Sequence, residues 1–158
     1  MRRYMRDNGH YMDMVKQLKD KFHDSLGHIF TDEILIMVDD EFEVKLPKAK
    51  KGEEITEEQM DKYKDKKKKA WKFNLKTIPQ IYQDSLESRK QFLLIVRRSL
   101  IEEISEEQTI AFLYSELRKI STDYKLQKPD LNTFSDLVKM LGRTDWDSAY
   151  DIPNLLTI

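Results

Sequence analysis

The spacing of apolar residues predicts helices at both ends of the chain. Apolar side chains recur at helical intervals over residues 9–26, and Gly27 follows at the position expected of a C-terminal cap. A second helical pattern follows Asp130, a suitable N-cap, and ends at Gly142. We therefore predict a first helix over about residues 9–26 and a last helix between Asp130 and Gly142.

Three short segments have the composition of β-strands. Residues 33–39 (EILIMVD) and 91–97 (QFLLIVR) are apolar and rich in β-branched side chains, as buried strands are. Residues 71–77 alternate between apolar and polar side chains, which predicts a half-buried strand that ends before Pro79. Residues 78–86 are expected to form a turn or a short helix.

A further helix is predicted after Ser105. Ser105 and Gln108 have the spacing of a capping box, in which each side chain bonds the backbone of the other residue. The apolar stripe of this helix consists of Ile110, Leu113, Leu117 and Ile120. Trp146 and the IPNLL tail are expected to pack back onto the core. The order of elements predicts an α+β domain, with a short antiparallel or mixed sheet packed against three to four helices.

The segment from about residue 40 to 69 differs from the rest, because Lys, Glu and Asp dominate it. Thr56 and Gln59 form a second capping box, so a solvated helix is predicted to run to about residue 69. Opposite charges four residues apart would support that helix. We regard residues 45–69 as a charged insert in one domain that spans residues 1–158.

Composition excludes several classes of function. The 158 residues include 28 basic and 29 acidic side chains, so a net charge of −1 gives no overall attraction for nucleic acid. There is no cysteine, which excludes disulfides and thiolate metal sites. The first residues lack an apolar signal-peptide core, and no apolar run approaches the length of a membrane span. We expect a protein of the host-cell cytoplasm with no membrane partner.

The helix after Ser105 carries a degenerate catalytic motif. Zinc-peptidase helices contain H-E-x-x-H, in which two histidines one turn apart bind zinc and the glutamate acts as general base. In this chain the frame is Ser115-Glu116-Leu117-Arg118-Lys119. The glutamate is retained and both histidines are replaced. This pattern indicates descent from an enzyme that no longer performs its reaction.

Four segments in order give the chain a resemblance to a known family. They are EILIMVDDE, a strand of the FLLIV kind, IEEISEEQTIAFLYSELRKI, and LGRTDWDSAYDIPNLL near the end. Together they resemble the phage metallopeptidase family, small zincin-like domains of phages and other mobile elements, over about residues 20–158. The resemblance implies a zincin-like fold.

The resemblance also places three zinc-ligand positions, at Ser115, Lys119 and Pro129, and the general base at Glu116. Serine is a poor zinc ligand, a protonated lysine repels a cation, and a proline side chain has no donor atom. We therefore expect no metal, no cofactor and no catalytic residue. The chain's histidines, His10, His23 and His28, all belong to the first helix region, so they would require a different site.

Glu116 then needs another role, because a general base of this kind acts on a metal-bound water. We favour an ion pair with Lys119 or Arg118, or simple exposure on the helix. The resemblance implies that Trp146 lies near the side of the domain that carries the family's active site, so it could line a residual cleft.

A cluster of basic residues next to an aromatic side chain marks a candidate binding surface in the insert. It could contact nucleic-acid phosphates or an acidic protein, whereas the simpler interpretation is a solvated face. The candidate binding residues are Lys62, Lys64, Lys66, Lys67, Lys68, Lys69 and Trp71.

The preferred hypothesis is an inactive zincin-like protein of a phage or mobile element that acts by binding a protein. The partner would be a host or phage factor, and the protein could be a counter-defence inhibitor such as an anti-CRISPR protein, acting on a CRISPR effector. One alternative is a nucleic-acid-binding protein that uses the lysine-rich insert. Another is a hydrolase with a non-standard site around Glu116, Lys119 and Asp130.

Overall fold

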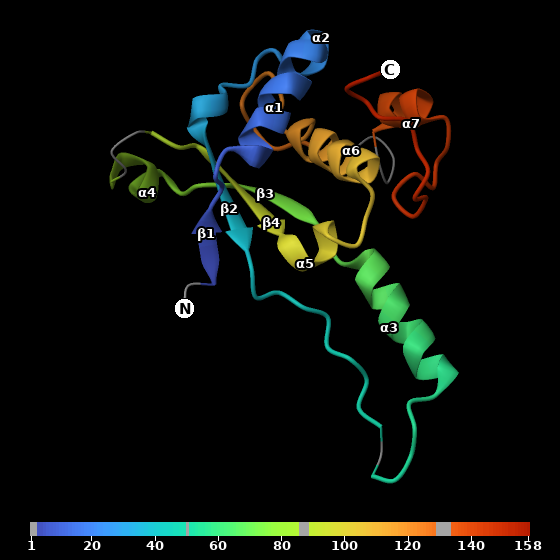
Figure 1. Cartoon of the computed structure of the whole chain (residues 1–158). Coiled ribbons are helices and arrows are strands. Elements are labelled where there is room, and N and C mark those ends of the chain that lie inside the picture. The colour runs from blue at the N-terminus through green and yellow to red at the C-terminus, as the bar shows by residue number, and fades with distance from the viewer. Residues whose placement is uncertain (1–2, 50, 86–88, 129–133) are drawn as a thin grey trace.

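The structure is a computed structural model that describes residues 3–49, 51–85, 89–128 and 134–158. Its centre is a four-stranded mixed sheet in the order β1-β2-β4-β3 (Figure 1). The strands are β1 (Tyr4–Arg6), β2 (Ile34–Asp39), β3 (Phe73–Thr77) and β4 (Phe92–Arg97). Strands β2 and β4 pair in parallel, whereas β1 and β3 run antiparallel to their neighbours and form the two edges. The predicted α+β class and mixed sheet are confirmed.

The described residues form seven α-helices and one 3-10 turn. They are α1 (His10–Lys21), α2 (His23–Leu26), α3 (Glu57–Lys69), α4 (Gln80–Ser85), α5 (Arg98–Ile101), α6 (Glu106–Leu117), α7 (Ser135–Leu141) and the turn η1 (Thr31–Glu33). Helix α4 lies in segment 78–86, where a turn or short helix was predicted, and α2 is the separated end of the predicted first helix. The four-residue α5 was not predicted, because it is too short to produce a periodic pattern.

Helices α1 and α6 cover one face of the sheet and enclose the core (Figure 1). Alternate side chains of β2 and β4 point toward these helices and are buried, as their period of two requires. The four predicted stripe residues are buried, with Ile110, Leu113, Leu117 and Ile120 at most 1% exposed. Helix α6 ends at Leu117, so Ile120 lies beyond it and not on the helix as predicted.

The first helix is broken where one continuous helix was expected. Phe22 leaves the helical conformation, with φ −106° and ψ 52°, so α1 ends before it and α2 follows. Gly27 does not act as a left-handed cap, because its φ is −61°. It is needed for space instead: a Cβ at this position would lie 2.4 Å from the carbonyl oxygen of His23.

Strand β1 was not predicted. All its residues are exposed, so no alternation of apolar and polar side chains marks it. It is held beside β2 by Arg3, whose Nε and Nη2 each donate to Asp39 at 3.0 Å. Burial raises the pKa of Asp39, but hydrogen bonds from Arg3 and from the backbone lower it below its ordinary value.

The C-terminal elements pack as the sequence predicts. Helix α7 ends at Gly142, whose φ of 78° is the left-handed conformation of a glycine cap. Trp146, Ile152 and Leu155 are buried in the core. Asp130, the expected N-cap, lies outside the described residues, and the described part of the helix begins at Ser135.

We use the name arm for residues 41–69, whose described parts (41–49 and 51–69) extend away from the sheet and end in α3 (Figure 1). Helix α3 starts at the predicted capping box, with both bonds between Thr56 and Gln59 present. The predicted ion pairs Glu58–Lys62 and Asp65–Lys69 have N–O distances of 4.0 and 2.9 Å. No residue of α3 is buried, so contacts with the core do not hold this helix in place.

In the part of the chain that the structure describes, no helix has the length and apolar character needed to cross a membrane.

Candidate functional site

Helix α6 passes beside the edge strand β3, and the two elements are joined through Glu116. The carbonyl oxygen of Lys72 accepts from the N–H of Arg97 (3.0 Å), and the N–H of Ile78 donates to Gln91 (2.8 Å). Even-numbered backbone groups of β3 therefore face β4, and the N–H of Leu75 points away from the sheet. Glu116 Oε2 accepts this N–H at 3.0 Å.

The second oxygen of Glu116 is also engaged. Lys119 Nζ donates to Glu116 Oε1 at 2.6 Å, and the Glu116 side chain is only 14% exposed. The ion pair with Lys119 that the sequence favoured is thus present, whereas the alternative of simple exposure is wrong. The carboxylate caps a free N–H of the edge strand and holds the helix against it.

Two of the three positions that the resemblance assigns to zinc lie in or just after α6, at Ser115 and Lys119. Ser115 is in the last turn of α6 and Lys119 lies two residues beyond the end of the helix, where its ammonium contacts the Glu116 carboxylate. The described residues contain no group of three His, Asp or Glu side chains that could hold a metal. Pro129 lies outside them. The donors present therefore do not fit zinc.

The histidines of the first helix region have other contacts. His28 Nε2 lies 2.7 Å from the carbonyl oxygen of Ile120, at the end of the α6 segment. His10 packs edge-on against Tyr11. His28 therefore links α2 to the loop after α6.

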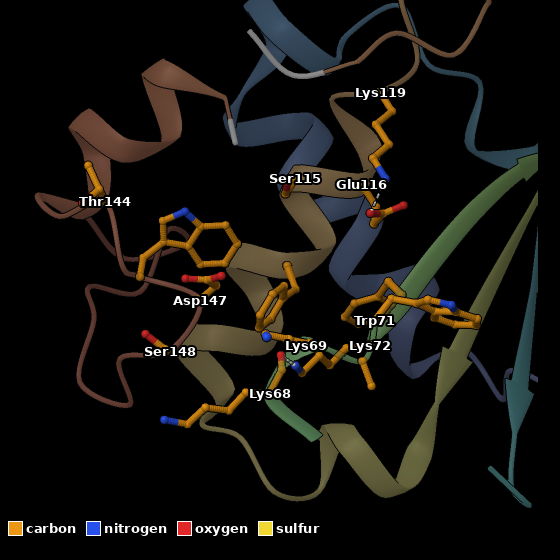
Figure 2. A pocket seen from close by; sticks show the side chains of 14 residues that line it. Lys68, Lys69, Trp71, Lys72, Ser115, Glu116, Lys119, Thr144, Asp147 and Ser148 are labelled. Atoms are coloured by element: carbon orange, nitrogen blue, oxygen red, sulfur yellow. Dashed lines mark hydrogen bonds and ion pairs between the residues drawn. The ribbon is translucent and has the colours of Figure 1, made fainter. Parts of the chain in front are cut away.

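A cleft of about 560 Å³ lies between the end of α3, the start of β3, α6 and the C-terminal segment. Figure 2 shows Trp71 on one side of it and Thr144, Asp147 and Ser148 on the other. The cleft brings together candidates that are far apart in the sequence. The predicted residues that line it are Lys68, Lys69, Trp71, Ser115, Glu116, Lys119 and Trp146.

Aromatic side chains form much of the cleft wall. The rings of Phe112 and Trp146 are in contact, with centroids 4.9 Å apart. The guanidinium of Arg97 lies between two rings, 3.4 Å from the centre of Trp71 and 3.6 Å from that of Phe42. Trp71 is therefore fixed by a stacking contact and presents a rigid surface.

Lys72 is a cleft residue that the sequence did not identify. The alternating pattern placed it on the polar side of a strand, yet it is only 6% exposed. Its Nζ donates to the carbonyl oxygen of Lys68 at 2.8 Å and lies 5.2 Å from the centre of the Phe112 ring. Burial lowers the pKa of this amine.

The lysines of α3 do not form one continuous surface. Lys62, Lys67 and Lys69 are ion-paired, with Glu58, Glu103 and Asp65 respectively. Lys64 and Lys66 are exposed and do not line the cleft. Lys68 and Lys69 reach the cleft, so the predicted basic surface is divided between paired, solvated and cleft-facing side chains.

The chain has an α+β fold in which the helix that carries the degenerate motif lies beside the edge strand of a mixed sheet. A family model with the description "Putative phage metallopeptidase" matches residues 2–154, so the chain belongs to this family. Comparisons with curated proteins and with solved structures found no match.

Proposed function

We propose that this chain is a catalytically inactive, zincin-like member of its family that acts by binding another protein. The observation that carries the proposal is the state of Glu116. One of its oxygens accepts the Leu75 N–H and the other the Lys119 ammonium, so the carboxylate is held by contacts within the fold at the position where the family has its general base. The replacement of histidine by serine and lysine at the two helix positions supports the same conclusion.

The cleft supports protein binding, because it combines an open volume with fixed aromatic side chains and charged groups at its rim. Aromatic residues supply much of the binding energy at protein interfaces. The phage origin of the family suggests a partner in the host-cell cytoplasm. A host defence factor such as a CRISPR effector is one concrete candidate, in which case the protein would be an anti-CRISPR inhibitor.

The two alternatives receive less support. Binding of nucleic acid through the insert needs free cations, and three of the six α3 lysines are already ion-paired. A hydrolase around Glu116 would need a free carboxylate, and both oxygens are engaged. Asp130, the third member of that proposed site, is outside the described residues.

Zinc content tests the loss of the family chemistry. The protein purified from zinc-containing medium should retain no stoichiometric zinc, and Ser115→Ala should leave the trace amount unchanged. The matched comparison is the double variant Ser115→His with Lys119→His, which restores two ligands and should bind zinc more tightly than the natural chain. A full equivalent of zinc in the natural chain, lost on Ser115→Ala, would overturn the proposal.

Partner capture from host cells tests the binding role. The captured protein should be lost on Lys68→Glu, at the cleft, and kept on Lys64→Glu, on the exposed part of the same helix. Capture of nucleic acid alone, with affinity that falls steeply as salt rises, would favour the alternative function.

A further inference from the structure

Lys72 is a buried cation with an incomplete set of partners. An ammonium group has three donors, and the described residues supply one acceptor, the carbonyl oxygen of Lys68. Lys72 forms no ion pair with them; Asp147 and Glu103 act on it only through space. A buried charge without a hydrogen-bonded counter-ion is unfavourable, so this site is suited to an incoming anion.

The position of Lys72 makes it accessible to a ligand. It lines both the main cleft and an adjoining hollow of about 180 Å³. Figure 2 shows Lys72 among Lys68 and Lys69, on the side of the cleft away from Glu116 and Lys119. Lys69 and Lys119 are already paired with Asp65 and Glu116, which leaves Lys68 and Lys72 as the cleft lysines without an ion pair among the described residues.

We propose that Lys72, assisted by Lys68, binds the carboxylate of an Asp or Glu side chain that a protein partner inserts into the cleft. This proposal rests on the proposed function and specifies the chemistry of the partner. The incoming carboxylate would accept from the Lys72 ammonium, and the neighbouring residues of the partner would lie against Trp71, Phe112 and Trp146.

The structure favours side-chain insertion over addition of a strand to the sheet. Leu75 has the outward N–H at the middle of β3, and Glu116 already accepts it. A partner strand could form a continuous ladder there only by displacing a carboxylate that Lys119 also holds. A single acidic side chain requires no such displacement.

A protein carboxylate also fits better than a phosphodiester backbone. Nucleic acid is bound by a row of cations that follow successive phosphates. The cleft offers two unpaired lysines, and Asp147 adds a negative charge to its lining. Such a site suits one anionic group with apolar neighbours.

The test uses the full chain and two capped peptides, Ac-Leu-Glu-Leu-Glu-Leu-amide and its Gln counterpart, with tryptophan fluorescence as the measure of binding. The Glu peptide should bind at least about tenfold more tightly than the Gln peptide, as loss of one charge-assisted hydrogen bond implies. Lys72→Met should remove this preference. Lys64→Met, on the exposed part of α3, should keep it, and Asp147→Asn should strengthen it.

A second readout keeps the test independent of how well Lys72→Met folds. The side-chain NMR signal of Lys72 in the natural chain should shift on addition of the Glu peptide and not of the Gln peptide. Equal affinity for the two peptides, no binding of either, or a preference that survives Lys72→Met would each overturn the acidic anchor. Tighter binding of oligo-dT, lost in Lys72→Met, would replace it with a phosphate ligand.

These outcomes are distinct from failure of the proposed function. A partner that is captured through the cleft while the two peptides bind equally leaves the binding role intact and removes the acidic anchor. Stoichiometric zinc at Ser115 would overturn the proposed loss of the family chemistry, whatever the peptides do.

Discussion

Helices α3 and α6 have similar lengths and begin in the same way, yet their surroundings are opposite. Each opens with a complete capping box, Thr56 with Gln59 in α3 and Ser105 with Gln108 in α6. Seven residues of α6 are buried and none of α3 is. Local sequence therefore specifies both helices equally well, whereas burial decides which of them the fold depends on.

The largest effect is expected at the centre of α6. Leu117 is fully buried, so Leu117→Ala should lower the free energy of unfolding by roughly 2–5 kcal/mol through the cavity it leaves. A denaturant titration measures this. The matched control is Lys64→Ala in α3, which should change the midpoint very little. Equal effects of the two variants would contradict the contrast between the helices.

Substitution of Glu116 should have an intermediate effect on the free energy of unfolding. A surface ion pair would contribute under about 1 kcal/mol, but this carboxylate also accepts a backbone N–H at the sheet edge. We expect Glu116→Ala to cost about 1–3 kcal/mol, because it leaves the Leu75 N–H without its partner. Lys119→Ala removes only the ion pair and should cost less in the same titration; the reverse order would show that the N–H contact is unimportant.

The two capping boxes provide a smaller and sharper test. Ser105→Ala should lower the global stability by about 1 kcal/mol, since α6 is part of the core. Thr56→Ala removes the same capping contact, but not the additional bond that Ser105 Oγ donates to the Tyr150 carbonyl oxygen (2.9 Å). It should only fray α3 and leave the global unfolding midpoint unchanged. Hydrogen exchange of the α3 amides alongside the denaturant titration separates the two responses, and a shift of the global midpoint by Thr56→Ala would show that the arm is coupled to the core.

Substitution of Lys72 should stabilise the fold, whereas the preceding substitutions destabilise it. Its folded-state pKa is lowered by burial, so the unfolded chain binds a proton more readily and the charge destabilises the fold at neutral pH. Lys72→Met should therefore raise the midpoint at pH 7. The natural chain regains this stability as pH rises from the lowered pKa toward 10.5, the ordinary lysine value. If the difference in unfolding midpoint between Lys72→Met and the natural chain widened over this pH range, the burial argument would be contradicted.

The smallest effect on folding is expected from shortening the arm. Deletion of residues 53–66 leaves the Lys67–Glu103 ion pair and a connecting loop, and it removes no buried residue. The shortened chain should unfold cooperatively, with a midpoint near that of the natural protein, as circular dichroism would show. Loss of cooperative unfolding would mean that the arm is structural.

The elements with strong patterns could be predicted from sequence, and those that tertiary contacts define could not. The β2 and β4 segments, both capping boxes and the α6 stripe all carry their signal in a few neighbouring residues. Strand β1 has only exposed side chains, and its position depends on the contact of Arg3 with Asp39. The break at Phe22 likewise has no local signal, because helical spacing of apolar residues continues through it.

The sequence identified most residues of the candidate site, but it did not show that they line one cleft. The motif frame predicted Ser115, Glu116 and Lys119 on one helix, whereas Lys119 lies two residues beyond the end of α6. That Lys68, Lys69 and Trp71 line the same cleft follows from the path of the chain between α3 and β3. Lys72 was missed, because a lysine in an alternating strand is usually solvated, and its contacts here with Phe112 and the Lys68 carbonyl oxygen come from the tertiary structure.

The stack of Phe42, Arg97 and Trp71 has a consequence for how this protein can vary. Phe42 lies just beyond β2, where the arm begins, and Trp71 lies just after α3, where it ends. Both rings rest on one guanidinium of β4, so the two ends of the arm are pinned together at a single point. Lengthening a loop whose ends are already held together adds little entropic cost. Recombination could therefore exchange the residues between these two rings for unrelated sequences, and relatives could acquire different arms on the same sheet.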